Sequence, residues 1–289
     1  MTLSATVTPR TADPYPTRIS GAPELIDRTD PSVWSFDTLG PIDQATLASH
    51  HAKGFSVHHD LLGQSEVAAC RDELARLATD PARTSDERTV LSGSGEVRTI
   101  YEVHESSALL AELVSDPRVL DRARQLLDSD VYVHQSRVDY LPAFHGKGAY
   151  WHSDFEVWHA EDGMPAPRAV SMAVPLTGEQ EMTGELMAMP GSHRTFVPTL
   201  RGANGVPSRD HLTTLGAAYG IDRFTDAEGS LLMLDANLMQ GSADNITPFP
   251  RTNIFVVFSS VANPLGAPFA GGPPRPSFVA SRDATPLRR

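Results

Sequence analysis

From residue 130 onward, the chain carries a succession of strand-like runs, and this pattern constrains the fold more than any other feature. The run VYVHQSRVDYL at 131–141 is rich in β-branched and aromatic residues, and its side chains alternate between two faces. Gly and Pro clusters separate the runs that follow, at 149–155, 168–176, 185–189, 230–236 and 252–261. Many short strands of this kind are typical of a double-sheet β core.

The first 130 residues have a different pattern. Residues 1–40 are rich in Pro, Thr, Ser and Asp, which predicts an extended N-terminal arm. Apolar spacing and cap residues predict helices at 41–53, 65–79, 106–114 and 117–127, a helical insertion at 208–220, and short strands at 55–57 and 99–103.

Together these patterns predict an α+β fold with an all-β core and an α layer. We expect a double-stranded β-helix (a jelly roll, cupin-like) with helices packed on one sheet. The arm would span 1–40, and a single domain would span 41–289. The end of that domain, from residue 263, is a Pro- and Gly-rich tail that wraps back over the surface.

Composition narrows the classes of partner. The chain has 289 residues and a net charge of −12, which argues against nucleic acid and weakly against an anionic membrane surface. No apolar run approaches the ~18 residues of a membrane span, and the N-terminus does not have the pattern of a signal peptide. Cys70 is the only cysteine, so no intramolecular disulfide can form, and we expect a cytoplasmic protein.

The sharpest local motif is Tyr150-Trp-His-Ser-Asp154. His152 and Asp154 are two residues apart, so on a regular strand both side chains point to the same face. An imidazole and a carboxylate at one point are two thirds of a 2-His-1-carboxylate site, which leaves iron positions open for a cosubstrate and oxygen. Alone the motif is weak, but the aromatic residues around it in a β-rich region favour a functional site.

A second cluster lies toward the C-terminus, in Asn237–Ser242 and Asn245–Arg251. In jelly-roll dioxygenases, a distal metal ligand is followed on the next strand by an arginine. The guanidinium fork of this arginine pairs with the far carboxylate of 2-oxoglutarate. Gln240 and Arg251 have the matching separation, although the residue at the ligand position is an amide.

Four blocks of the chain resemble signature blocks of the ectoine hydroxylases, within the phytanoyl-CoA dioxygenase superfamily. The blocks are WHSDFEVWHAEDGMP, HQSR, GELMAMPGSHRTF and NITPFPR, and the resemblance extends from DPYPTR to PRPSF. It implies that iron(II), 2-oxoglutarate and O2 are used to hydroxylate ectoine or a related small zwitterionic cyclic amino acid.

The resemblance also implies roles for individual residues, with ordinary strand or core packing as the alternative at each position. Catalysis would depend on His152, Asp154 and Arg251. Iron would bind His152, Asp154 and Gln240, and the cosubstrate would lie near Ser242, Arg251 and Asp139. The substrate pocket would hold five residues, of which Arg137 could pair with a carboxylate and the two aromatics could pack on a ring or cation: Gln135, Arg137, Trp158, Asn253 and Phe255.

Three residues depart from the pattern of the family. Gln240 replaces a histidine ligand, and an amide oxygen is a weaker donor to iron(II) than imidazole. Asp139 replaces an asparagine beside the cosubstrate, where a negative charge is unfavourable unless it is paired. Val157 replaces a threonine. His134 and His159 are conceivable substitute ligands, although neither evidently shares the face of His152.

The departures leave a second function open. The chain could be a diverged member whose iron and 2-oxoglutarate chemistry is lost or altered, acting as a small-molecule binder or a non-redox enzyme. Retention of His152, Asp154, Ser242 and Arg251 argues for the hydroxylase, because a binder does not need them. The sequence does not determine the oligomeric state and leaves a homodimer open.

Overall fold

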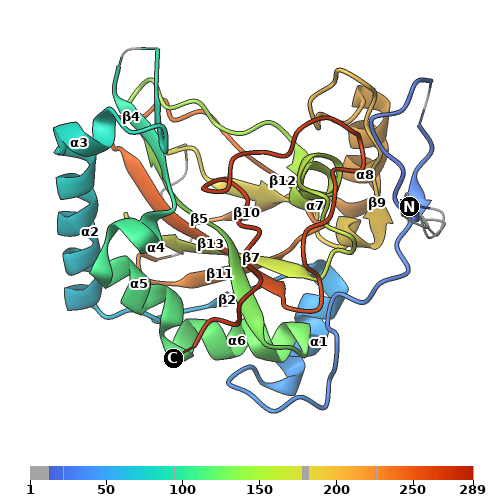
Figure 1. Ribbon diagram of the computed structural model, residues 1–289, viewed down its shortest axis with the longest axis horizontal. Helices are drawn as coiled ribbons and strands as arrows, with labels where there is room; N and C mark the ends of the chain where they lie inside the picture. Colours follow the sequence, from blue (N-terminus) through green and yellow to red (C-terminus); the bar gives the residue numbers. More distant parts are fainter. Residues whose placement is uncertain (1–12, 22, 94, 178–181, 226, 289) are drawn as a thin grey trace, which may run out of the picture.

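The computed structural model describes residues 13–21, 23–93, 95–177, 182–225 and 227–288 (Figure 1). Two antiparallel sheets form the core. The larger has the strand order β2-β11-β7-β13-β5-β4-β3, and the smaller has the order β10-β8-β12-β6. Within the predicted arm, the described residues contain one short strand, β1 (Ile26–Asp27), which pairs with β9 (Thr195–Phe196).

The strands are short, as the sequence predicts. In the larger sheet they are β2 (Phe55–His58), β3 (Thr89–Leu91), β4 (Val97–Tyr101), β5 (Val131–Leu141), β7 (Ala169–Pro175), β11 (Leu231–Asp235) and β13 (Arg251–Ser260). In the smaller sheet they are β6 (His152–Ser153), β8 (Leu186–Ala188), β10 (Asp222–Phe224) and β12 (Met239–Ser242).

The alternation of side chains along β13 shows how the helices and the two sheets are arranged. Ile254, Val256 and Phe258 pack into the largest apolar cluster, together with residues of the helices. Phe255 points the other way and packs with Ala188 of β8 and Phe224 of β10, in the smaller sheet. Since side chains alternate along a strand, one face of the larger sheet meets the helices and the other meets the smaller sheet.

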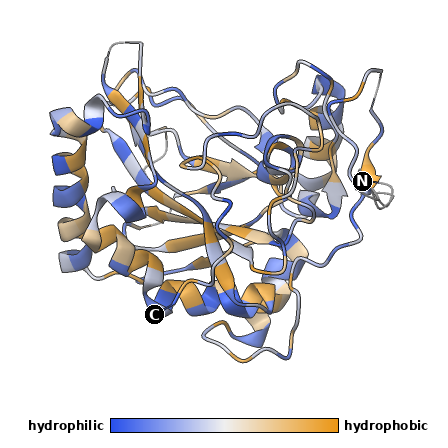
Figure 2. Ribbon diagram, viewed as in Figure 1, coloured by the Kyte–Doolittle hydropathy of each residue, from blue (hydrophilic) through white to orange (hydrophobic). Residues whose placement is uncertain are grey.

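The helices are distributed unevenly. The helices α1 (Gln44–Lys53), α2 (Gln64–Thr79), α5 (Ala108–Ser115) and α6 (Pro117–Leu127) contribute buried apolar residues to the cluster on the larger sheet. Figure 2 shows these helices apolar on the sheet side. The remaining helical segments are α3 (Pro81–Thr84), α4 (Val103–Ser106), α7 (Asp154–Val157), the π-helix η1 (Trp158–Asp162), the 3-10 turn η2 (Ser192–Arg194) and α8 (Arg209–Tyr219). No helix in these described ranges is long and apolar enough to cross a bilayer.

Cap residues explain where two helices begin. Asp43 accepts a hydrogen bond from the Thr46 amide, so α1 begins at Gln44 and not at residue 41. Ser107 accepts from the Leu110 amide, so α5 begins at Ala108 and not at residue 106. The α1 helix ends at Lys53, and the residue that caps it, Gly54, has a φ of 82°, which favours glycine.

The prediction differs most from the structure around residue 150. A strand was expected over 149–155, but β6 contains only His152 and Ser153, and Asp154 begins α7. The short strand β12 was not predicted. It exists because β8 pairs with one of its edges and β6 with the other, and such partners are distant in sequence.

Candidate active site

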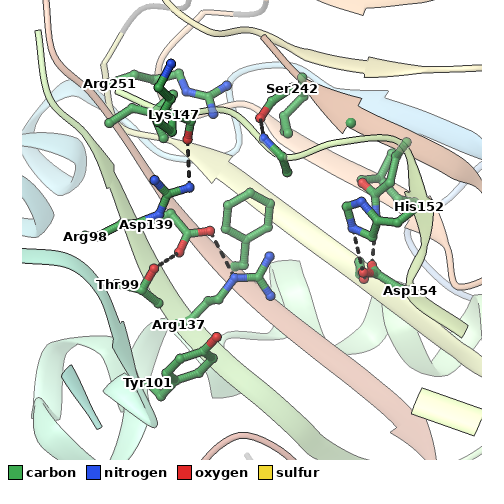
Figure 3. A pocket seen from close by; sticks show the side chains of 18 residues that line it. Arg98, Thr99, Tyr101, Arg137, Asp139, Lys147, His152, Asp154, Ser242 and Arg251 are labelled. Atoms are coloured by element: carbon green, nitrogen blue, oxygen red, sulfur yellow. Dashed lines mark hydrogen bonds and ion pairs between the residues drawn. The ribbon is translucent and has the colours of Figure 1, made fainter. Parts of the chain in front are cut away.

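A cavity of about 240 Å3 lies between the two sheets. Its walls come from the larger sheet, through β4, β5, β7, β11 and β13, and from the smaller sheet, through β6, β8 and β12. Figure 3 shows His152 and Asp154 on one side of the cavity and a group of basic side chains on the other. The cavity therefore has two chemically distinct regions.

His152 and Asp154 meet despite the break in the strand. His152 Nε2 lies 3.4 Å from Asp154 Oδ1. The other ring nitrogen, His152 Nδ1, is 2.7 Å from the carbonyl oxygen of Tyr150 and must donate to it. This hydrogen bond fixes the ring orientation and leaves Nε2 facing the carboxylate, as in histidines that bind metals.

The Asp154 carboxylate has three partners. Besides His152, Ser171 of β7 donates a hydrogen bond to its Oδ2 over 2.8 Å. Burial opposes ionisation, but the hydrogen bond and charge of His152, with the charge of Arg137, outweigh it and hold the pKa of Asp154 below its usual value. Burial likewise disfavours the charged imidazole, but the hydrogen bond to Asp154 raises the pKa of His152.

The third partner of the carboxylate is Gln240. Strand β12 pairs with β6 so that Gln240 lies directly opposite His152. Gln240 Nε2 donates to Asp154 Oδ2 over 2.7 Å. The structure thus brings together the three residues for which metal binding was predicted.

The donor set can be tested against iron(II). Among the described residues, no group of three or more His, Cys, Asp or Glu could hold a metal ion. The third donor would have to be the Gln240 amide oxygen, which reaches the position of Nε2 when the amide turns over. An imidazole nitrogen, a carboxylate and an amide oxygen fit a divalent ion, with the amide as the weakest of the three.

The far side of the cavity is basic. Arg251, the first residue of β13, is 4% exposed and lines this side with Ser242 of β12. Lys147 lines it too and forms an ion pair with Asp244 over 2.6 Å. Arg98 donates to the Lys147 carbonyl over 2.7 Å. Two arginines and a lysine at one end suit a ligand with a carboxylate there.

Arg137 and Phe255 form the side wall. They face each other across the β5–β13 pair, and the guanidinium lies 4.5 Å from the centre of the Phe255 ring. Arg137 Nε donates to Asp139 Oδ2 over 3.0 Å, and Thr99 donates to Asp139 Oδ1 over 2.8 Å. Asp139 is therefore paired with a cation on the cavity wall, which is the condition under which its charge can be accommodated.

Three of the predicted substrate residues lie outside this cavity lining. Trp158 is buried in another cluster, 5.1 Å from the ring of His134. Gln135 lines a groove between β5 and the C-terminal tail. Asn253 faces a small space near β8 and β10.

The histidines weighed as substitute ligands also lie elsewhere. His134 is fully buried, 3.5 Å from Asp162. His159 Nδ1 donates to the Met164 carbonyl over 2.8 Å, and its ring stacks on Phe269. Neither ring lines the cavity, and neither does Val157.

Several residues that line the cavity were not predicted from the sequence. Arg98 and Lys147 add to the positive charge of Arg251, and Ser171 supplies a hydrogen bond to Asp154. Arg98 lies beside the predicted strand at 99–103, and Lys147 lies in a loop, so neither carried a motif. Ser171 lies on a predicted strand, but alternation does not reveal which polar residue meets a distant carboxylate.

Comparisons with known proteins bear on the family and the fold of the chain. The family model for phytanoyl-CoA dioxygenase (PhyH) matches residues 50–253. An ectoine dioxygenase of Nocardia farcinica is 49% identical over 95% of each chain, and one of Streptomyces avermitilis is 47% identical over 96% of this chain and 98% of the other. The crystal structure of EctD from S. alaskensis with 2-oxoglutarate and 5-hydroxyectoine superposes with a TM-score of 0.89, at 42% identity over 95% of this chain and 96% of that one.

Proposed function

The chain belongs to the phytanoyl-CoA dioxygenase family and, within it, to the ectoine dioxygenases, and from this premise we propose that it hydroxylates ectoine with iron(II), 2-oxoglutarate and O2. The observation that carries the proposal is one cavity with two regions. His152 and Asp154 lie on one side, and Arg251 and Ser242 lie on the other. Iron and a dicarboxylate cosubstrate, if bound together, would need both regions.

His152, Asp154 and Gln240 would hold the iron. The bound iron and 2-oxoglutarate supply the oxygen-activating chemistry. The protein's part is to orient the donors. Tyr150 and Ser171 fix His152 and Asp154 through hydrogen bonds of 2.7 and 2.8 Å, so these two ligands are preorganised.

Arg251 would bind the far carboxylate of 2-oxoglutarate. A guanidinium offers two parallel donors, and its burial at 4% exposure strengthens the pairing by excluding water. Ser242 lies on β12, two residues after Gln240, so both side chains point into the same cavity. Its hydroxyl already accepts from the Ala149 amide over 2.8 Å, which leaves its own hydrogen to donate to a carboxylate. Asp139, the third residue predicted beside the cosubstrate, lines the same cavity.

Arg137 and Phe255 would bind ectoine. Arg137 Nη2 is available for a substrate carboxylate because the bonds of this arginine to Asp139 and Gln135 use Nε and Nη1. Phe255 offers a flat apolar surface for a small ring. For Gln135, Trp158 and Asn253, a substrate role stays a prediction from the resemblance.

A second candidate function has specific support. Gln240 donates a hydrogen bond to one carboxylate oxygen of Asp154, and Asp139 forms an ion pair with Arg137. The proposed metal ligand Asp154 and the proposed substrate-binding residue Arg137 therefore already have partners within the protein. This arrangement favours a diverged member that binds a small molecule without turnover. The two candidates differ in one product, succinate.

The test measures succinate release with ectoine, iron(II), ascorbate and 2-oxoglutarate in air, together with mass spectrometry of the product. The proposal predicts one succinate and one added oxygen atom per ectoine consumed. Arg251→Ala is the matched negative control. Ectoine binding without succinate would support the diverged binder instead.

Three further points stay predictions. The division into an arm at 1–40 and one domain at 41–289 rests on sequence composition. A cytoplasmic location rests on the single cysteine, Cys70, which is buried and whose pKa burial raises to about 11. A homodimer is compatible with the proposed function and could be measured by light scattering.

A further inference from the structure

The C-terminal tail is anchored by a buried ion pair. Arg275 Nε and Nη2 donate to the two carboxylate oxygens of Asp162 over 2.7 and 2.6 Å. The Asp162 side chain is fully buried at the end of η1, four residues after Trp158. Arg282, further along the tail, donates to the Asp162 backbone carbonyl over 2.9 Å. One aspartate therefore holds the tail at two points.

The anchored tail contacts β5. The Ser281 amide donates to the His134 carbonyl over 2.8 Å, which aligns the tail along the strand. Next to it, Gln135 Nε2 donates to the Val279 carbonyl over 2.7 Å. Figure 1 shows the tail, in red, crossing β5. The side chain of Gln135 is thus oriented by a backbone atom of the tail.

Gln135 in turn contacts the cavity wall. Its other amide atom, Oε1, accepts a hydrogen bond from Arg137 Nη1. Because Nε2 is committed to the Val279 carbonyl, the amide cannot turn over without losing both bonds. The guanidinium of Arg137 is then fixed by Gln135 at Nη1, by Asp139 at Nε and by the Phe255 ring on its face.

We propose that the tail is a positioning element for the substrate, in which Arg275 acts through Asp162 and the Val279 carbonyl to fix Gln135 and thereby Arg137. The inference rests on the proposed function, since Arg137 is the residue assigned to the ectoine carboxylate. Arg275, Asp162 and Val279 are positioning residues, remote from the reacting atoms. Their effect falls on binding of the substrate and leaves iron and 2-oxoglutarate binding unchanged.

Electrostatics explain why the Arg275–Asp162 ion pair is stable. Burial opposes the charge on Asp162, but the hydrogen bonds and charge of Arg275, together with the nearby His134, outweigh it and keep the pKa of this carboxyl below its usual value. Loss of Arg275 leaves a buried carboxylate with His134 as its remaining side-chain partner, at 3.5 Å. The tail around Val279 then loses its fixed position, because the two hydrogen bonds from Arg275 to the buried carboxylate are lost.

The test compares Arg275→Ala with the parental chain in steady-state kinetics. We expect the KM for ectoine to rise about tenfold, with kcat and the KM for 2-oxoglutarate changing less than about twofold. Arg275→Lys, which keeps the charge, should recover part of the loss. Arg288→Ala is the matched control, because Arg288 is an exposed arginine of the same tail, and it should behave as the parent. If Arg275→Ala does not fold, Arg275→Gln takes its place.

A double-mutant cycle with Gln135→Ala tests the route. If the tail acts through Gln135, the double variant should have nearly the same KM for ectoine as Gln135→Ala alone. Additive effects, or equal losses in kcat and both KM values with a lower melting temperature, would overturn the proposal. If the parental chain neither binds nor turns over ectoine, both proposals fail, whereas an active parent with an unaffected Arg275→Ala variant overturns this one alone.

Discussion

Gln240 Nε2 donates a hydrogen bond to Asp154 Oδ2 over 2.7 Å, from the position on β12 directly opposite His152. The residue that could complete an iron site is thus bonded to one of the other two ligands. Iron binding requires the amide to turn over and exchange this hydrogen bond for a bond from its oxygen to the metal. The exchange lowers metal affinity, because a bond within the protein is lost and an amide is a weak donor.

Gln240→His should strengthen metal binding. An imidazole at this position completes two histidines and one carboxylate, and it does not depend on turning an amide. We expect at least about tenfold tighter binding of cobalt(II) or iron(II), measured by anaerobic titration. Gln240→Leu is the control of similar size without a donor, and it should bind more weakly than the parent. Equal affinities of the parental and Leu chains would show that Gln240 is not a ligand.

Arg251→Lys should weaken 2-oxoglutarate binding and leave metal binding intact. Lysine keeps the charge but loses the two parallel donors of guanidinium. The KM for 2-oxoglutarate should rise by about tenfold or more, with an unchanged cobalt(II) affinity. Lys147→Arg is a useful comparison, because Lys147 is an exposed cation of the same region, and it should have a small effect. A fall in metal affinity for Arg251→Lys would contradict the assignment.

Asp139→Asn should improve binding of ectoine. Asparagine keeps an oxygen that can accept from Thr99 or Arg137, but it removes the negative charge that partly neutralises Arg137. We expect the KM for ectoine to fall about threefold or more, since the guanidinium then presents its full charge to the substrate carboxylate. Asp244→Asn, at the partner of Lys147, is the control. A higher KM for Asp139→Asn would mean that the charge of Asp139 itself holds Arg137 in place.

Burial of His50 makes the folding stability depend on pH. Burial lowers the pKa of His50 from 6.5 to about 3, so the folded chain excludes a proton that the unfolded chain binds as the pH falls below 6.5. The contribution of neutral His50 to the free energy of unfolding is fully present above pH 6.5 and is lost as the pH falls toward 3. Compared with His50→Gln, the parent should lose about 2 kcal/mol more free energy of unfolding between about pH 7.5 and pH 5.0, measured with urea. Equal losses would contradict this account.

Much of the fold could be predicted because its signals are local. Side chains alternate along β13, so that Ile254 faces the helices and Phe255 faces the second sheet. Asp116, the N-cap of α6, marks the start of this helix at Pro117, where the sequence predicted it. By contrast, β12 has no alternating pattern and depends on partners brought close by the fold.

Part of the site was predictable because its signal is also local in the sequence. The spacing of His152 and Asp154 predicted that they meet, and they do, although the carboxylate projects from the first residue of α7 and not from a strand. Burial of Trp158 against His134, and the bonds of Gln135 to Val279 and Arg137, depend on tertiary packing. A sequence motif can indicate that such residues are important, but it does not show which residues they contact.

The most direct test of the central claim is an anaerobic titration of the parental chain with iron(II) and 2-oxoglutarate. We expect the weak visible charge-transfer band of iron(II) with bound 2-oxoglutarate, saturating with about one iron per chain, and we expect the band to disappear in Asp154→Ala. No band at millimolar iron would contradict the claim that His152, Asp154 and Gln240 form a working iron site.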